Sequence, residues 1–279
     1  MIFIPSIAVL LACHNRRDKT IQCLTALYLQ VGLIESYTIE VFLVDDASTD
    51  GTAESIKINF PEVNIIQGNG NLFWNRGMHL AWKTAAATKD FDYYLWLNDD
   101  TFLEKIALQI LLQEKYPLSI VCGTTKSRLE QKANYGGYAI KPRKLLAPNG
   151  DYQRSDYCNG NCVLIPKEVF YKLGNLDPIF HHALGDFDYS LRARKMGIDI
   201  HVAPDYIGTC ESHDFVPKWQ NSTISWRKRL KNLYTVSSGC CPSEFFVFEK
   251  RHNGLMVACC HYLTTHLRAI FPQLWKTKN

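Results

Sequence analysis

The sequence predicts an α/β fold in which a mainly parallel sheet is flanked by helices and followed by a C-terminal helical extension. Short apolar runs alternate with helical patterns through the first half of the chain, which is typical of a parallel sheet. Three of the predicted strands lead directly into polar or acidic loops. The 279 residues, of which 47% are hydrophobic, are enough for one large domain or two small ones. A disordered or fibrous chain is therefore excluded.

The elements of the first half follow from apolar runs of strand length and from helical periodicity. The segment 19–29 illustrates the second pattern, because Ile21, Leu24 and Leu27 recur on one face of a helix. The loop 45–52 contains the small polar residues that favour a helix start. We expect strands at 7–12, 40–44, 63–67, 93–97 and 119–122, and helices at 19–29, 53–59, 75–88 and 105–116.

Beyond residue 123 the pattern is less regular. A strand is predicted at 162–165, and a helix follows at 166–173. Another helix is expected at 189–196, because acidic residues precede it and basic residues occupy its C-terminal half, an arrangement that suits the helix dipole.

The formal net charge of +4 is too small for a general nucleic-acid-binding protein, but it is unevenly distributed. Residues 217–279 contain ten basic and two acidic residues, a net charge of +8, so residues 1–216 carry a net charge of −4. This change in composition near residue 215 predicts one domain at 1–215 and a basic, amphipathic helical extension at 216–279.

Two amphipathic helices are expected in the extension, at 224–234 and 255–275. Basic amphipathic helices bind anionic membrane surfaces, where each nearby Lys or Arg contributes about 1 kcal/mol. Helices that pack on the sheet as a subdomain, or that form a homodimer interface, show the same apolar stripe. Both interpretations stay open on the sequence alone.

The ten cysteines favour reduced thiols over a disulfide scaffold, because such scaffolds are short and this chain is long enough to build a core. Their spacing does not fit a structural zinc site. The apolar segment 2–13 has no basic region before it and contains Pro5, so we interpret it as a buried first strand and not as a signal peptide. No apolar run reaches the roughly 20 residues that span a bilayer. We expect the protein in the cytoplasm. If the protein binds a membrane as a peripheral protein, we expect it at the inner face of the cell membrane.

The polar loops after three predicted strands should meet in one cleft, because ligands bind beyond the carboxyl ends of the strands in open α/β sheets. Asp99 and Asp100 could hold a hard divalent cation that bridges nucleotide phosphates, or could form a solvated turn that caps a helix. Asp45 and Asp46 could likewise belong to a helix-capping loop, or could accept a donor such as the imide N–H of uracil or thymine. The three loops lie at 13–16, 45–46 and 99–100.

Five short motifs follow one another at 13–16, 44–52, 68–78, 97–101 and 184–192. They read Cys-His-Asn-Arg, Val-Asp-Asp-Ala-Ser-Thr-Asp-Gly-Thr, Gly-Asn-Gly-Asn-Leu-Phe-Trp-Asn-Arg-Gly-Met, Leu-Asn-Asp-Asp-Thr and Leu-Gly-Asp-Phe-Asp-Tyr-Ser-Leu-Arg. In this order and at these distances they resemble glycosyltransferase family 2, the inverting GT-A enzymes that use nucleotide-sugar donors. The resemblance covers about residues 5 to 215 and implies a GT-A fold with a Rossmann-like sheet.

The resemblance also implies roles for individual residues. Asp186 matches the catalytic base, and Gly185 stands before it where many relatives have an acid. The segment 157–162 resembles the part of the family that lines the donor phosphates and the acceptor site, and His181 and His182 are expected to shape the acceptor pocket. The positions that match the family's nucleotide-binding groups are Ala12, His14, Arg16, Asp45, Asp46, Asn75, Arg76 and Gly77.

A metal site is implied in the same way. Asp100 matches the metal-binding aspartate of the family's Asp-x-Asp motif, with Mn²⁺ or Mg²⁺ as the cofactor. Asn98 replaces the first acid of that motif, which leaves Asp99 a role toward the donor sugar or the ribose. His213 lies where some members of the family complete the metal shell.

We therefore expect an inverting glycosyltransferase that moves a sugar from a dTDP-rhamnose or UDP-hexose type of donor to a hydroxyl of a glycan or lipid-linked saccharide. The motif set resembles the rhamnosyltransferase-like branch of bacterial surface-polysaccharide enzymes. One alternative is a nucleotidyltransferase that forms sugar nucleotides, which would want a glycine-rich loop after the first strand; residues 13–19 contain no glycine. Another is a non-catalytic scaffold of a polysaccharide-assembly complex, which would not need both the 98–100 triplet and Asp186.

Overall fold

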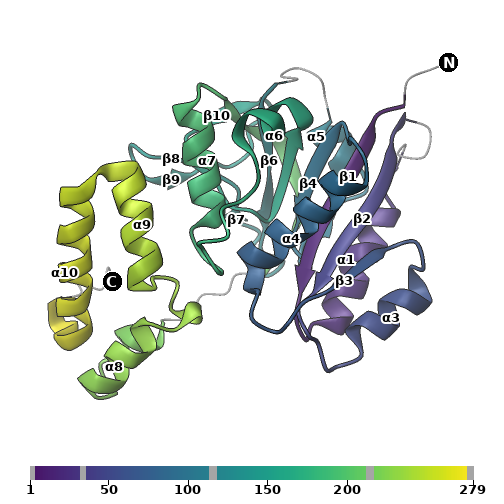
Figure 1. The fold of residues 1–279 in the computed structure, drawn as a ribbon. Helices are drawn as coiled ribbons and strands as arrows, with labels where there is room; N and C mark the ends of the chain where they lie inside the picture. Colours follow the sequence, from purple (N-terminus) through teal and green to yellow (C-terminus); the bar gives the residue numbers. More distant parts are fainter. Residues whose placement is uncertain (1–3, 32–35, 113–117, 212–216, 275–279) are drawn as a thin grey trace.

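The computed structural model describes residues 4–31, 36–112, 118–211 and 217–274, in which a mixed sheet is covered by helices on both faces (Figure 1). The strands are β1 (Ser6–Cys13), β2 (Thr38–Asp45), β3 (Asn64–Gln67), β4 (Tyr93–Leu97), β5 (Phe102–Leu103), β6 (Ile120–Lys126), β7 (Ala133–Tyr135), β8 (Gly137–Ala139), β9 (Lys144–Leu145), β10 (Gln153–Ser155), β11 (Tyr157–Cys158), β12 (Cys162–Pro166) and β13 (Ile200–Thr209). The main sheet has the order β10-β13-β6-β12-β4-β1-β2-β3, with β5 on β13 and β7 on β6, and a small sheet has the order β11-β8-β9.

Strand direction in the main sheet changes at β12. The pairs β1 with β2, β1 with β4 and β2 with β3 are parallel, and so is β6 with β13. β12 lies between β4 and β6 and runs antiparallel to both. The predicted α/β class with a mainly parallel sheet is confirmed, and the reversed central strand is a feature that the sequence pattern did not indicate.

Both faces of the sheet are buried, which explains why its strands are apolar throughout and do not alternate. Alternate residues of β1 belong to different cores: Ile7, Val9 and Leu11 pack with one cluster, whereas Ala8 and Leu10 pack with the other. The first cluster is covered by α1 (Arg17–Tyr28), α3 (Thr52–Asn59) and α5 (Ala107–Leu111), and the second by α4 (Phe73–Thr88), α6 (Lys167–Leu173) and α7 (Gly185–Lys195).

Two differences from the predicted elements concern residues 105–116 and β13. The helix expected at 105–116 is the short α5, and residues 113–117 lie outside the described residues. β13 had no predicted range, because Pro204 interrupts its apolar pattern and proline disfavours a strand. The structure accommodates Pro204 where the register between β13 and β6 shifts, between Val202 and Tyr206. A bulge of this kind removes the need for a ladder hydrogen bond at the proline.

The C-terminal region folds into helices around a small core of Trp219, Leu233 and Ala269. The helices expected at 224–234 and 255–275 correspond to α8 and α10, whereas α9 was not expected. Figure 1 shows α9 beside α7, with α10 antiparallel to α9 on its outer side. The elements of this region are η1 (Lys218–Gln220), α8 (Trp226–Leu233), η2 (Val236–Ser238), α9 (Pro242–Asn253), α10 (Leu255–Ile270) and η3 (Pro272–Leu274).

Two predictions about the chain's chemistry can be compared with the fold. All ten cysteines are free, as reduced thiols require. Among the described residues, no helix has both the length and the apolar character needed to cross a bilayer.

Candidate functional site

A cavity of about 480 Å³ opens where the loops after β1, β2 and β4 meet the start of α7. This position agrees with the prediction that the polar loops converge at the carboxyl ends of the strands. Seven of the residues predicted as the base, as nucleotide-binding groups or as metal ligands line the cavity. They are Ala12, His14, Arg16, Asp46, Asp99, Asp100 and Asp186.

Arg16 joins the two aspartates that follow β4. Its Nη1 atom lies 3.0 Å from Oδ1 of Asp99 and 2.8 Å from Oδ2 of Asp100. Both carboxylates are only 5% exposed. A single cationic group thus bridges two buried carboxylates, and this reduces the repulsion between them.

The carboxylates retain acceptor capacity beyond these contacts. Oδ2 of Asp99 is buried and has no hydrogen-bond partner among the described residues. Burial raises the pKa of Asp99 to about 7, with a contribution from Asp100 and an opposing one from Arg16. Cys210 places its thiol 3.7 Å from Oδ1 of Asp100. A buried carboxylate oxygen without a hydrogen-bond partner, such as Oδ2 of Asp99, is expected where a further positively charged group binds.

The residues present fit a divalent cation that is shared with a ligand. Mg²⁺ and similar ions commonly take one or two protein carboxylates and complete their shell with water and phosphate oxygens. Asp99 and Asp100 supply that number. Within the described parts of the chain, no cluster of three or more His, Cys, Asp or Glu side chains is arranged to hold a metal. The predicted third ligand, His213, lies outside the described residues.

Asn98, the first residue of the triplet, contacts an aromatic side chain of the cavity. Its Oδ1 accepts a hydrogen bond of 2.6 Å from the indole N–H of Trp74. An Asn in this place therefore orients an aromatic ring that lines the cavity, and the acidic chemistry falls to the two following residues.

Asp186 occupies the first turn of α7 and borders the same cavity. The backbone N–H of Gly160 donates to its Oδ2 at 2.9 Å, and the N–H of Phe187 donates to its Oδ1 at 2.8 Å. Burial raises the pKa of Asp186 to about 6, although these hydrogen bonds act in the opposite direction. A carboxylate held in one orientation, with a pKa closer to neutrality, is suited to accept a proton.

Gly160 can lie against the Trp74 ring because it has no side chain. A Cβ atom at this position would lie 2.4 Å from the indole of Trp74. The expectation that the segment 157–162 reaches the site agrees with the structure, since Asn159, Gly160 and Asn161 all line the cavity.

Asp45 and Asp46 obtain their hydrogen-bond donors from the protein backbone. Oδ1 of Asp45 accepts the N–H of Ser48 at 3.0 Å. Asp46 accepts the N–H groups of the loop before α4, from Gly70 at 2.7 Å and from Leu72 and Phe73 at 2.9 Å each. The adjacent carboxylates therefore have donors without a bound base. Asp46 reaches the cavity and shapes this loop, whereas Asp45 does not line the cavity.

Asn75, Arg76 and Gly77 lie behind the cavity wall and do not line it. Asn75 is fully buried and donates from Nδ2 to the carbonyls of Asp177 and Phe180 at 2.8 and 2.7 Å. Arg76 donates from Nε to the carbonyl of Pro178 at 2.8 Å. Gly77 allows α4 to approach β1, because a Cβ there would lie 2.8 Å from that of Ala12. Asn75 and Arg76 thus position the loop that leads to α7, and Gly77 sets the distance between α4 and β1.

The same packing explains the missing acid before Asp186. A Cβ atom at Gly185 would lie 1.8 Å from Oδ1 of Asn75. No side chain fits at residue 185 while Asn75 holds its present position.

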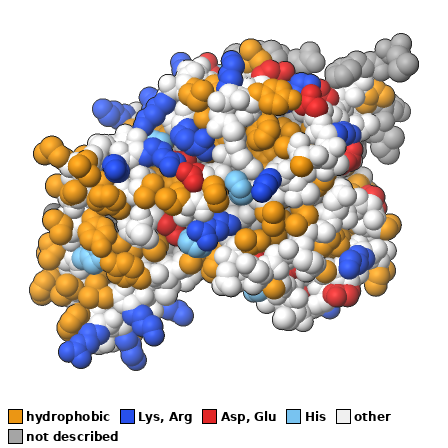
Figure 2. All heavy atoms as spheres, in the orientation of Figure 1, with side chains coloured by type: hydrophobic (Ala, Val, Ile, Leu, Met, Phe, Trp, Pro, Cys, Tyr) orange, Lys and Arg blue, Asp and Glu red, His pale blue; other side chains and the backbone are white. Residues whose placement is uncertain are grey.

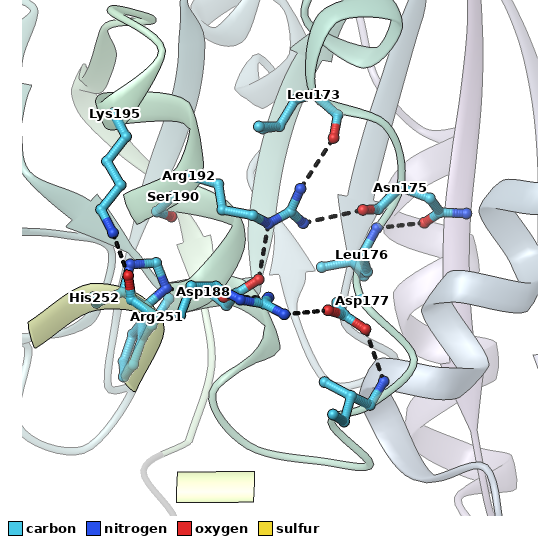
Figure 3. Close-up of polar contacts among 12 residues, drawn as sticks. Leu173, Asn175, Leu176, Asp177, Asp188, Ser190, Arg192, Lys195, Arg251 and His252 are labelled. Carbon is cyan, nitrogen blue, oxygen red and sulfur yellow. Dashed lines mark hydrogen bonds and ion pairs between the residues drawn. The ribbon is translucent and has the colours of Figure 1, made fainter. Parts of the chain in front are cut away.

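The C-terminal helix α9 is joined to α7 by a buried network of ion pairs (Figure 3). Asp188, on α7, is 0% exposed. Its Oδ1 lies 2.8 Å from Nη1 of Arg251 and 2.9 Å from Nε2 of His252, and its Oδ2 lies 2.9 Å from Nε of Arg192. Burial alone would raise the pKa of Asp188, but these partners hold it below its ordinary value. Arg251 also binds Asp177 at 2.7 Å.

A second contact joins α9 to the loop before α7. Glu244 lies with Oε1 2.6 Å from Nδ1 of His181, and its Oε2 accepts the N–H of His181 at 3.1 Å. The carbonyl of His181 in turn accepts the N–H of Asn75 at 3.0 Å. His182, the next residue, lines the cavity whereas His181 does not. Part of the basic extension, α9, therefore packs on the domain. This agrees with the interpretation in which helices of the extension form a packed subdomain.

Several cavity residues were not predicted from the sequence. Cys210 was missed because the strand that delivers it, β13, is interrupted by Pro204. Tyr135 comes from an irregular stretch with no periodic signal. The aromatic residues next to motif positions, Phe73 and Phe187, could have been found as neighbours of those motifs.

Comparisons with known proteins agree with this arrangement. The sequence pattern of the family described as Glycosyl transferase family 2 matches residues 8–174. None of the curated proteins matches the sequence.

Solved structures show similarity in fold. The mannosyltransferase PcManGT from Pyrobaculum calidifontis, in complex with GDP-Man and Mn²⁺, has 18% identity and a TM-score of 0.52, over 98% of this chain and 74% of that one. TarS 1–349 from S. aureus, in complex with UDP, has 12% identity and a TM-score of 0.58, over 98% of this chain and 76% of that one. GalNAc-T7, with UDP, GalNAc and Mn²⁺, has 15% identity and a TM-score of 0.55, over 90% of this chain and 55% of that one. The GT-A-like fold is confirmed.

Proposed function

Because the chain belongs to glycosyl transferase family 2, we propose that it is an inverting, metal-dependent enzyme that transfers a sugar from a nucleotide-sugar donor to an acceptor hydroxyl. The observation that carries this proposal is that Asp186 shares one cavity with the Asp99–Asp100 pair. The first has the properties of a proton acceptor, and the pair has those of a cation site. The cavity can therefore serve both partners of a glycosyl transfer.

The proposed donor site lies at Asp99, Asp100 and Arg16. Asp100, with Asp99 beside it, would hold Mn²⁺ or Mg²⁺, and the bound ion would supply positive charge to offset that of the leaving diphosphate. Arg16 already places one positive charge between these carboxylates. We assign the base and ribose to the wall formed by Ala12, His14, Arg16 and Asp46. Asp45 and Gly77 lie behind this wall, and Asn75 and Arg76 hold the loop that leads to Asp186. His213 is retained as a candidate ligand.

Asp186 is proposed to be the catalytic base. The acceptor hydroxyl oxygen attacks the anomeric carbon from the face opposite the diphosphate, while its proton passes to a carboxylate oxygen of Asp186. The bond from the anomeric carbon to the diphosphate oxygen breaks, and its electron pair leaves with the diphosphate. The N–H groups of Gly160 and Phe187 fix the carboxylate for this transfer.

The proposed donors are UDP-hexoses and dTDP-rhamnose, and the proposed acceptor is a hydroxyl of a glycan or lipid-linked saccharide in surface-polysaccharide synthesis. The comparisons support a nucleoside-diphosphate donor in general, because the similar structures were solved with GDP-Man or UDP. They lend no support to rhamnose over other sugars, so a panel of donors must decide. The free cysteines are consistent with a reducing compartment such as the cytoplasm.

The test of the proposed function is Asp186→Asn. We expect the variant to lose at least about 100-fold in transfer rate, because general base catalysis contributes 10²- to 10⁴-fold, and to keep binding of UDP with Mn²⁺. Asp205→Asn, an exposed acid on β13 outside the cavity, is the matched control. Full transfer activity in Asp186→Asn would show that the base is another group.

The same assay separates the alternatives. A scaffold would neither hydrolyse nor transfer any donor of the panel. A nucleotidyltransferase would release pyrophosphate from a nucleoside triphosphate and a sugar phosphate. No observation in the structure favours either one over glycosyl transfer.

A further inference from the structure

The outermost helix, α10, carries its apolar side chains on the outside. Its almost fully buried residues, Ala258, Thr265 and Ala269, are small or polar, and Tyr262 adds a ring contact with Phe246 of α9. The outward residues include Met256, 83% exposed, and Leu263, 64% exposed. A helix that only completes a globular subdomain shows the opposite pattern. The outward face therefore points to a partner outside the described chain.

The exposed residues form one continuous stripe. The spacing of the exposed apolar residues places them on one side of the helix, away from the buried residues, and the exposed Arg268 lies outside this side. Figure 2 shows hydrophobic side chains gathered over α9 and α10. Contiguous exposed apolar patches mark interaction surfaces. We call this set the apolar stripe: Leu255, Met256, Cys259, Cys260, Leu263 and Leu267.

Basic side chains lie at the carboxyl end of the apolar stripe. Arg229 of α8 is buried and donates to the carbonyls of Ala269 and Ile270, at 2.7 and 2.9 Å, which fixes α8 at the last turn of α10. Arg227, Lys228 and Lys231 on the same helix are exposed. Figure 2 shows Lys and Arg gathered at the end of the molecule where α8 lies.

No acidic side chain balances this charge on the outside of the extension. Residues 217–279 contain only two acids, Glu244 and Glu249, and both are buried, at 8% and 6% exposure. Glu244 binds His181, and Glu249 accepts a hydrogen bond of 2.7 Å from Asn253. The exposed surface of the extension thus combines an apolar stripe with uncompensated positive charge.

We propose that the apolar stripe and the basic side chains of α8 bind the surface of an anionic lipid bilayer, with α10 lying in the interface. The apolar side chains enter the acyl boundary, and the Lys and Arg side chains meet the headgroup phosphates. A second copy of the chain fits this surface less well. A two-fold contact between apolar stripes would bring the basic ends of both copies into one interface without acids to pair them.

The test is flotation of the full chain with vesicles of phosphatidylcholine alone or mixed with phosphatidylglycerol. We expect the chain to float with the anionic vesicles, and Leu263→Glu/Leu267→Glu to reduce the bound fraction by at least about tenfold. Ile58→Glu on α3, another exposed apolar helix residue, is the matched control and should bind as the unchanged chain does. Circular dichroism verifies that each variant is folded.

The charge contribution is tested separately. Arg227→Glu/Lys228→Glu should lower partitioning to anionic vesicles at least about tenfold and leave binding to phosphatidylcholine unchanged. Lys57→Glu/Lys83→Glu on the domain carries the same charge change and should have little effect.

The proposal does not depend on the proposed function, because lipid binding is measured without donor or acceptor. It is overturned if the chain does not float with anionic vesicles, or if Leu263→Glu/Leu267→Glu binds as well as Ile58→Glu. It is also overturned if light scattering shows a dimer that this double variant dissociates while vesicles bind neither form, since a second copy would then cover the stripe.

Discussion

Asp186 is half-buried and held by two backbone N–H groups, and desolvation raises its pKa to about 6, above the ordinary value of 3.8. A base acts only in its ionised form, so protonation on acidification removes activity. Because the pKa is raised, this loss begins near pH 6 and not near pH 4. We expect kcat/KM for the acceptor, measured at saturating donor, to fall about tenfold for each pH unit below about 6.

Asp99 provides the control for this prediction, because burial raises its pKa as well, to about 7. If Asp186 sets the acid limb, Asp99→Asn will lower the rate at every pH and keep the limb near pH 6. A limb that disappears in Asp99→Asn would assign the titration to the donor site. A profile that stays flat down to about pH 5 would exclude both groups as the controlling acid.

At the residue scale, the sequence identified the groups that carry charge into the cavity. Four such groups line the cavity: Arg16, Asp99, Asp100 and Asp186. They could be predicted because each lies next to a strand or helix with a clear sequence pattern. The roles of Asn75 and Arg76 could not be predicted, since they depend on contacts with a loop about 100 residues away. Such contacts are set by tertiary packing, which a single sequence does not display.

At the element scale, apolar runs and helical periodicity located most strands and helices. No range was predicted for β13, because its proline lies in a bulge. The position of a bulge depends on pairing with the neighbouring strand, which a single sequence does not display. α9 was overlooked although Pro242 begins it and Gly254 follows it, a typical pair of helix boundaries. Its run of three aromatic residues and a valine, 245–248, obscures the helical period that the prediction relied on.

The contact between α9 and α7 leads to a prediction about Arg251. Removing this side chain in Arg251→Ala leaves Asp188 fully buried with fewer partners and frees Asp177. We expect a loss of about 2 kcal/mol in the free energy of unfolding, because breaking a buried ion pair strands a charge. Hydrogen exchange should increase over residues 177–188, the segment that leads to Asp186. Chemical denaturation and exchange by mass spectrometry measure both effects.

Arg154→Ala is the matched control for Arg251→Ala. Arg154 pairs with Asp199 at 2.6 Å, but the two side chains are 75% and 42% exposed. Exposed pairs contribute only about 0.2 to 1 kcal/mol. Equal losses of stability in the two variants would mean that the network around Asp188 does not fasten α9 to α7.

At the scale of the whole molecule, the sheet brings distant segments to one edge. β1, β2 and β4 run parallel, so the loops that follow them meet at the cavity. The loops after β1 and β4 are more than 80 residues apart in sequence. The sequence predicted this convergence from the strand pattern alone. It could not predict that α9, from the C-terminal region, would form ion pairs with Asp188 of α7 and with His181 in the loop before α7. That contact depends on single ion pairs between segments without a common motif.

A ligand that connects these segments should stabilise the whole fold, and Asp100 should decide how much. With UDP at about 100 times its Kd in the presence of Mn²⁺, mass action adds about 2.7 kcal/mol, or roughly 6 °C in Tm for a chain of this size. We expect Asp100→Ala to abolish the part of this shift that chelation by EDTA also removes. Asp205→Ala should keep the full shift, since it changes an acid outside the cavity. An undiminished Mn²⁺-dependent shift in Asp100→Ala would place the metal elsewhere in the molecule.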